Sequence, residues 1–211
     1  MFAPAKRGIF ISARVHPGEV PSSHVMNGIL KGLLKDTEVA RVLREKFVFY
    51  LVPIINPDGV FRGHYRTDKN GVNLNRYYIN PNPKDHSPIY AIKKFILHLH
   101  NSKRFFACLD MHAHASRKGA FIYGNYSTEL KKQLEICLFP KLLSMNSKNF
   151  EYEGSNFTEK NMYCKDRADS ISKEGAARVA LFKITKNPYC WTLECNYNMG
   201  RYENQLCQPN I

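Results

Sequence analysis

The sequence of 211 residues has no pair of cysteines in a C-x-x-C arrangement, so a zinc knuckle built from thiolates is not expected. Its six cysteines are scattered along the chain, which is typical of reduced and mostly buried thiols. No apolar run is long enough to cross a membrane as a helix, and the first seven residues lack the apolar core of a secretory signal. We therefore expect a cytoplasmic protein with no membrane partner.

Acidic residues are scarce. The 18 Asp and Glu stand against 31 Lys and Arg, which gives a formal net charge of +13 at pH 7. Such an excess favours a polyanionic partner. The chain has no helix-turn-helix cue and no aromatic motif of the kind found in RNA-binding sheets, and its basic residues are spread along the whole sequence. An acidic protein therefore fits the charge as well as nucleic acid does.

Short apolar runs alternate with segments of helical periodicity, and no repeat or interdomain linker interrupts them. The pattern predicts strands at 9–11, 47–55, 105–111, 120–123 and 190–194, and helices at 21–34, 37–44, 89–100 and 130–145. The run at 47–55 is apolar throughout, as in a central strand covered on both faces. The last helix carries one apolar stripe, made of Leu134, Leu138, Leu142 and Met145. The alternation predicts one α/β domain with a mixed, largely parallel central β-sheet and helices on both faces.

His16 and Glu19 lie three residues apart on the turn between the first strand and the first helix. At that separation an imidazole and a carboxylate can close on one metal ion. A catalytic zinc needs a third protein ligand and an open position for water. The pattern H-x-x-E is common by chance, so it is weak evidence alone, and a surface turn with a solvated glutamate is the alternative.

Further polar groups stand at strand ends, where α/β sheets bind their ligands. His112 follows a buried strand and is a natural third metal ligand, although the spacing leaves His114 open as an alternative. Asp110, two residues before His112, is placed to orient it or a neighbouring group. Glu194 lies in an apolar strand. It is either an edge carboxylate that faces solvent or a general base that takes a proton from metal-activated water.

A long polar loop from about residue 60 to residue 88 follows the second strand, and loops of this length are usually functional. It contains Arg62, Arg66 and Arg76, with Asn73 and Asn75. Guanidinium groups bind carboxylates through two parallel hydrogen bonds and stabilise oxyanions. Together with a zinc water and a carboxylate base, they suit the cleavage of a peptide bond next to a free C-terminal carboxylate.

Five motifs occur in the order seen in zinc metallocarboxypeptidases of the M14 type. They are His16-Pro17-Gly18-Glu19, Asn56-Pro57-Asp58-Gly59, Asn73-Leu74-Asn75-Arg76, Asp110-Met111-His112 and Thr192-Leu193-Glu194. Further stretches, at 62–68, 71–76, 159–163, 172–175 and 194–198, resemble the cytosolic carboxypeptidases, the tubulin deglutamylases. The resemblance covers nearly the whole chain.

The resemblance implies one zinc ion per chain, bound by His16, Glu19 and His112. It also implies Arg66 as the oxyanion stabiliser, Glu194 as the general base, and a clamp on the terminal carboxylate of the substrate made by Asn75 and Arg76. Specificity for glutamate implies a basic group in the side-chain pocket, for which Arg178 and Lys183 are both candidates. Secreted relatives place a tyrosine over the substrate in this stretch, whereas this sequence has Phe182, which lacks the hydroxyl.

The expected function is the removal of glutamate from acidic protein tails, with polyglutamylated tubulin as the expected carrier of the tail. The expected location is the cytoplasm, in association with microtubules, and no nucleic-acid partner is expected. One alternative is a zinc amidohydrolase of the aspartoacylase or succinylglutamate-desuccinylase kind. Another is an inactive, truncated module that binds acidic tails.

The resemblance also predicts that residues 1–211 are a partial catalytic domain with an incomplete fold. Family members carry a β-rich domain and a first strand–helix unit before this region, and a helix after the strand that contains the catalytic glutamate. Without these elements, apolar sheet surface is expected to be exposed.

Overall fold

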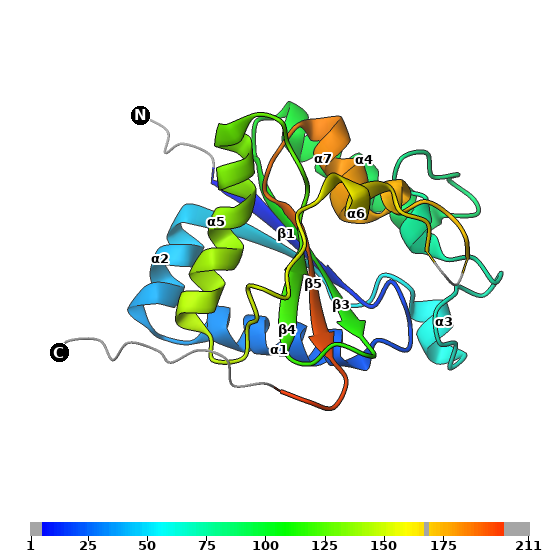
Figure 1. Cartoon of the computed structure of the whole chain (residues 1–211), viewed down its shortest axis with the longest axis horizontal. Coiled ribbons are helices and arrows are strands. Elements are labelled where there is room, and N and C mark those ends of the chain that lie inside the picture. The colour runs from blue at the N-terminus through cyan, green and yellow to red at the C-terminus, as the bar shows by residue number, and fades with distance from the viewer. Residues whose placement is uncertain (1–5, 167–168, 201–211) are drawn as a thin grey trace.

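The computed structural model describes residues 6–166 and 169–200. A five-stranded sheet forms its centre, in the order β2 (Phe47–Val52), β1 (Arg7–Ala13), β3 (Phe105–His114), β5 (Cys190–Asn196) and β4 (Ala120–Tyr123). The first four strands in this order are parallel, and β4 runs antiparallel to β5 (Figure 1). Within the described residues, no helix has the length and apolar character needed to cross a membrane.

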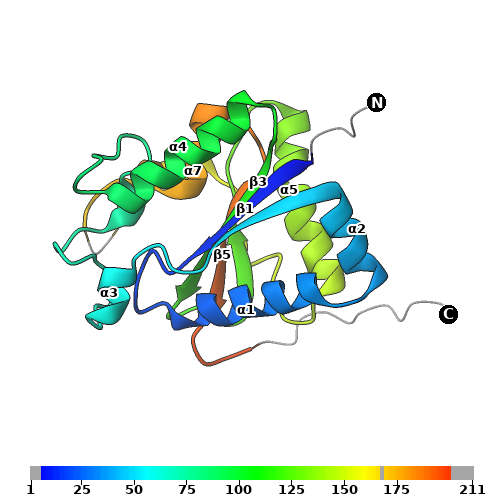
Figure 2. The ribbon, with the colours of Figure 1, turned by 180° about the vertical axis from the view of Figure 1, so that it is seen from behind.

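Helices cover both faces of the sheet. The longer ones are α1 (Val20–Leu34), α2 (Glu38–Lys46), α4 (Ser87–Asn101), α5 (Leu130–Asn146) and α7 (Ala177–Thr185). Helices α1 and α5 lie on one face and α4 and α7 on the other, while α2 lies beside α1 and leads into β2 (Figures 1 and 2). The short segments are α3 (Pro57–Phe61), α6 (Glu159–Tyr163) and the 3₁₀ turns η1 (Leu74–Arg76) and η2 (Lys173–Gly175). The predicted mixed α/β fold is confirmed.

The alternation of side chains along the strands separates two parts of the core. Phe10, Cys108 and Cys190 point to the face covered by α4 and α7, where Ile89, Ile96 and Leu181 pack against them. On the other face Met111 packs with Met26 of α1. There too Trp191 lies against α5, and its indole N–H donates to the carbonyl of Ile136 at 2.9 Å.

Residues 47–55 were predicted to form a central strand, but the strand lies at the edge of the described sheet. The strand ends at Val52 and, in the described sheet, lies next to β1 only, and all six of its residues are partly buried. Its apolar character comes from contacts on its two faces, such as Tyr50 against Phe95 of α4 and Phe47 stacked on Phe106. Such contacts make a run apolar without requiring a second neighbouring strand.

The predicted apolar stripe on α5 does not face the core. Leu134, Leu138, Leu142 and Met145 are between 47% and 62% exposed, and the buried side of the helix is formed by Ile136, Pro140 and Ser144.

The strand order creates one switch point. From β1 the chain passes to β2 on one side, and it later returns to form β3 on the other side of β1. Ligands of open parallel sheets bind in the crevice beyond the carboxyl ends of the two strands that flank such a point. This places the loop after β1 and the end of β3 at the expected position of a site.

Candidate active site

The turn after β1 brings His16 and Glu19 to the sheet edge. Arg14 has a left-handed backbone (φ 58°) and reverses the chain. The N–H of Gly18 donates to the carbonyl of Tyr65 at 2.8 Å, and a Cβ at this position would lie 2.7 Å from that oxygen. Because only glycine fits here, the turn is fixed against the polar loop. Glu19 then caps the start of α1 and directs its carboxylate back over the strand ends.

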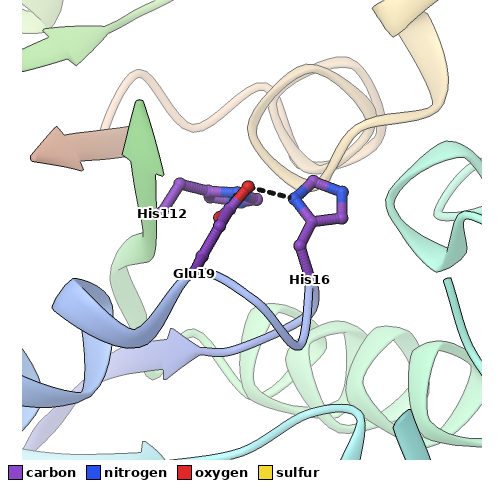
Figure 3. A group of neighbouring side chains, drawn as sticks. All are labelled: His16, Glu19 and His112. Atoms are coloured by element: carbon purple, nitrogen blue, oxygen red, sulfur yellow. Dashed lines mark hydrogen bonds and ion pairs between the residues drawn. The ribbon is translucent and has the colours of Figure 1, made fainter. Parts of the chain in front are cut away.

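His112 joins this pair from β3, so the three side chains converge (Figure 3). Each of the three side chains offers one potential ligand atom, and these three atoms lie within 4.8 Å of one another. His112 lies within β3 rather than after it, because β3 pairs with β5 as far as His114. His114 does not join the group: its Nδ1 accepts from the backbone N–H of Arg117 at 3.3 Å.

The two imidazoles point the same ring atom at the same carboxylate. The Nδ1 atoms of His16 and His112 lie 2.7 and 2.9 Å from the two oxygens of Glu19. Each Nε2 meets an oxygen behind the site: Asn73 Oδ1 for His16 at 3.0 Å and Asp110 Oδ2 for His112 at 2.8 Å. Such outer contacts fix the tautomer of a metal-binding histidine and orient its ring. Asp110 therefore has the geometry of the predicted orienting residue.

These donors fit zinc. Two imidazole nitrogens and one carboxylate form one of the common ligand sets of catalytic zinc, and the site opens into a cavity where water and substrate can enter. Burial, outweighing the attraction of Glu19, lowers the pKa of His16. For Glu19, burial alone would raise the pKa, but the two histidines hold it below its usual value. These shifts favour a neutral His16 and an ionised Glu19, which are the forms that bind a metal ion.

Glu194 lies next to this group, in register with His112 on the neighbouring strand. It is 9% exposed and lies on β5 between β3 and β4, so the alternative of a solvated edge carboxylate is wrong. Burial raises the pKa of Glu194 to about 8. Its Oε2 atom is buried without a hydrogen-bond partner, as expected of an oxygen that serves a group bound in the cavity.

Arg66, Arg76 and Asn75 line the same cavity, which has a volume of about 680 Å³. Nη1 of Arg66 lies 3.7 Å from Oε1 of Glu19. Arg76 is buried, and Asn75 is fixed because its Oδ1 accepts the backbone N–H of Ala177 at 3.1 Å. The Nε atoms of both arginines are buried without a hydrogen-bond partner. The structure therefore places these residues where a carboxylate or an oxyanion can bind, and their catalytic roles stay predictions.

The two candidates for the glutamate side-chain pocket separate clearly. Arg178, at the start of α7, lines the cavity with Glu194, whereas Lys183 and Phe182 lie about one turn further along α7 and line a different depression. Lys183 forms an ion pair with Glu174 at the surface. Phe182 packs against the core. The structure thus does not bring Lys183 and Phe182 into the cavity that Glu194 lines.

Several contributors were not foreseen from the sequence. Ser12 donates to the buried carboxylate of Asp110 at 2.7 Å and so holds the residue behind His112. The sequence contained a local signal for this pair, since Ser12 and Asp110 are both polar residues in otherwise apolar strands. Asp166 and Asp169 contact the arginines, and no local pattern marks them.

A model of the family described as zinc carboxypeptidase matches residues 2–180. The chain belongs to the zinc carboxypeptidase family. Human cytosolic carboxypeptidase-like protein 5 is 37% identical to it in an alignment of 294 residues that includes 97% of this chain and 33% of the relative. Mouse cytosolic carboxypeptidase 6 is 36% identical over 196 residues, which cover 91% of this chain and 34% of the relative.

A solved zinc carboxypeptidase fold matches as well. The metallo-carboxypeptidase from Burkholderia cenocepacia superposes with a TM-score of 0.76 at 24% identity, over 92% of this chain and 49% of that one. The chain thus spans about a third of the length of its curated relatives and about half the length of this solved structure. The family match favours a peptidase over the amidohydrolase alternative.

The assignment of the third ligand leads to a testable prediction. Replacing His112 by alanine removes one of the three converging donors, so the purified variant should contain much less zinc than the wild type. The matched variant His114→Ala removes an imidazole two residues away and should keep its zinc. Metal analysis of both purified proteins is the measurement. Full zinc occupancy in His112→Ala, with loss only in His114→Ala, would transfer the ligand role to His114.

Proposed function

We propose that this chain is a zinc-dependent carboxypeptidase that removes C-terminal glutamate from acidic protein tails, with the polyglutamylated tail of tubulin as the expected substrate. The observation that carries the proposal is the environment of Arg178. Its guanidinium is 3% exposed, and its hydrogen bonds go to neutral oxygens of Gly124, Asn125 and Asn161. Among the described residues, no carboxylate forms an ion pair with it within 4.0 Å.

A buried cation without a counter-ion is costly. In agreement with this cost, burial lowers the pKa of the Arg178 guanidinium to about 10. A glutamate side chain entering the cavity would supply the missing negative charge. An apolar or basic side chain would leave the guanidinium unpaired, so the pocket should select an acidic residue.

The reaction follows from the groups around the cavity. His16, Glu19 and His112 would hold zinc, which when bound would supply Lewis acidity toward the scissile carbonyl and toward water. Glu194 would be kept ionised by the positive charge of a bound zinc, which lowers its pKa, so that it can accept the proton of the attacking water and return it to the leaving amine. Arg66 stabilises the negative charge that develops on the carbonyl oxygen. Asn75 and Arg76 hold the α-carboxylate of the substrate and so fix which peptide bond is cut.

The relatives are named cytosolic carboxypeptidases, which supports a cytoplasmic location. Association with microtubules follows only if tubulin is the substrate, as we propose. The net charge of +13 fits an acidic partner of this kind.

The proposal is tested by incubating the purified protein with a peptide that ends in several glutamates and identifying the released amino acids. Free glutamate should appear, and the same peptide with an amidated C-terminus should release none, because the clamp requires a free carboxylate. Tail binding without release would favour the binding module. Release of acetate from N-acetylaspartate, with no action on the peptide, would favour the amidohydrolase.

The positive charge leads to a prediction about salt. If it helps to capture the tail, apparent affinity for a polyglutamate peptide should fall several-fold from low to moderate salt, because exposed charges are screened over about 8 Å at physiological ionic strength. A control peptide with glutamine at all positions except the C-terminal glutamate should show a much smaller dependence. Equal salt dependence for the two peptides would remove this role for the charge.

A further inference from the structure

Two aspartates of this chain contact Arg76 of the proposed clamp and Arg66, the proposed oxyanion stabiliser. Nη2 of Arg66 donates to Asp166 Oδ2 at 2.9 Å, and Nη2 of Arg76 donates to the same oxygen. Nε of Arg76 lies 3.4 Å from Asp169 Oδ2, and that oxygen also accepts from the side-chain amide of Asn73 at 2.6 Å. Two negative charges therefore face two positive ones inside the cavity.

Backbone hydrogen bonds hold these aspartates in place. The N–H of Asp166 donates to the carbonyl of Ile171, and the N–H of Ser170 donates to the carbonyl of Asp166, both at 2.9 Å. The N–H of Ile171 donates to Asp169 Oδ1 at 2.9 Å. The backbone N–H of Lys173 donates to the carbonyl of Cys164 at 3.0 Å, so the residues just before Asp166 and just after Ile171 are also joined. These hydrogen bonds tie Asp166 to Ser170 and Ile171 while its carboxylate contacts the two arginines.

This contact uses the N–H groups that a substrate needs. Nη1 of Arg76 donates to the carbonyl of Asn75 at 2.7 Å, Nη2 donates to Asp166, and Nε faces Asp169. Both geometries in which a guanidinium donates two parallel hydrogen bonds to a carboxylate use Nη2, so a terminal carboxylate that binds Arg76 in this way meets the charge of Asp166 at that atom. Arg66, the proposed oxyanion stabiliser, donates to the same carboxylate through its Nη2.

We propose that Asp166 is an internal stand-in for the terminal carboxylate of the substrate and must be displaced before the clamp can bind. The inference rests on the proposed function of Arg66 and Arg76. The apparent affinity of a ligand equals its affinity for the free clamp multiplied by the fraction of molecules in which the clamp is free. Asp166 therefore lowers the apparent affinity of the clamp for any carboxylate ligand. The cost of displacement is the same for every ligand that binds the clamp, so ligands with further contacts, such as a side-chain carboxylate on Arg178, still bind at concentrations at which ligands with one carboxylate do not.

The test is a calorimetric titration with L-glutamate of the wild type, Asp166→Asn and Asp36→Asn. The Asn side chain keeps the size of Asp166 but loses its charge. Because hydrogen bonds to charged groups are stronger than neutral ones, we expect Asp166→Asn to bind glutamate about tenfold more tightly than the wild type. Asp36→Asn removes the same charge from a side chain that is 97% exposed and should match the wild type. Equal, weaker or undetectable binding by Asp166→Asn overturns the proposal.

A second measurement needs no substitution. In the wild type, the amides of Ser170 and Ile171 should exchange hydrogen faster with saturating glutamate than without it. The N–H of Ser170 donates to Asp166 and that of Ile171 donates to Asp169, so displacement should weaken both hydrogen bonds. Unchanged or slower exchange contradicts displacement. Both readouts measure binding rather than turnover. If Asp166→Asn binds glutamate more tightly but the protein has no peptidase activity, this inference stands and the proposed function is rejected. If the protein is an active peptidase but Asp166→Asn does not bind glutamate more tightly, the proposed function stands and this inference is rejected.

Discussion

Replacing Glu194 by glutamine should reduce turnover by about 100- to 10,000-fold, the usual contribution of a general base. Glutamine keeps the shape of the side chain but cannot accept the proton. Glu194 is in register with His112 but is not one of the three converging donors, so the variant should keep its zinc. Arg76 and Arg178 are unchanged, and substrate binding should survive as well.

Turnover, zinc content and peptide affinity should be measured on one purified preparation of Glu194→Gln. Near-wild-type turnover would show that Glu194 is not the base. Loss of zinc together with turnover would make it a ligand or a structural residue. The pattern expected of a base is loss of turnover with zinc and affinity retained.

Replacing Arg178 by leucine should reverse the choice of substrate. Removing one partner of a buried charge pair costs about 2–5 kcal/mol, which corresponds to roughly 30- to 4,000-fold in kcat/KM for a C-terminal glutamate. The pocket would then be apolar, so activity on a C-terminal leucine should rise. The variant also leaves the carbonyl of Gly124 and the side chains of Asn125 and Asn161 without their donor, so some loss of stability is expected.

The ratio of the two rates isolates specificity from stability. Both peptides are assayed on the same preparation, so a loss of folded protein lowers both rates equally and leaves their ratio unchanged. Lys183→Leu is the matched control, because Lys183 lies on the same helix but pairs with Glu174 outside the cavity. An unchanged glutamate-to-leucine ratio in Arg178→Leu would mean that the pocket is built from other residues.

The parts of the site that the sequence revealed are those with a local pattern. His16 and Glu19 are three residues apart on one turn, and Asp110 and His112 alternate on one strand, so their common orientation follows from local geometry. Glu194 was recognisable because a carboxylate stands in an otherwise apolar strand. The five strands and helices α1, α2, α4 and α5 were predicted for the same reason, from periodicity and apolar runs, whereas α7 was not.

The remaining features depend on contacts between distant segments. An apolar run such as 47–55 reports burial but not the number of neighbouring strands, so the edge position of β2 was missed. The stripe on α5 had helical spacing, yet periodicity cannot tell which stripe faces the sheet. Arg178 and Lys183 differ by more than one helical turn, and only the position of the start of α7 beside Asn75 decides between them. Asp166 meets Arg66 across 100 residues.

The central claim is that one zinc ion at His16, Glu19 and His112 makes this cavity a glutamate-releasing active site. The most direct measurement removes metal with a chelator, restores zinc stepwise and records free glutamate released from a glutamate-ended peptide at each step. Release should be absent from the metal-free protein, rise in proportion to bound zinc and reach its maximum at one zinc per chain. Full release without zinc, or none from the zinc-saturated protein, would contradict the account.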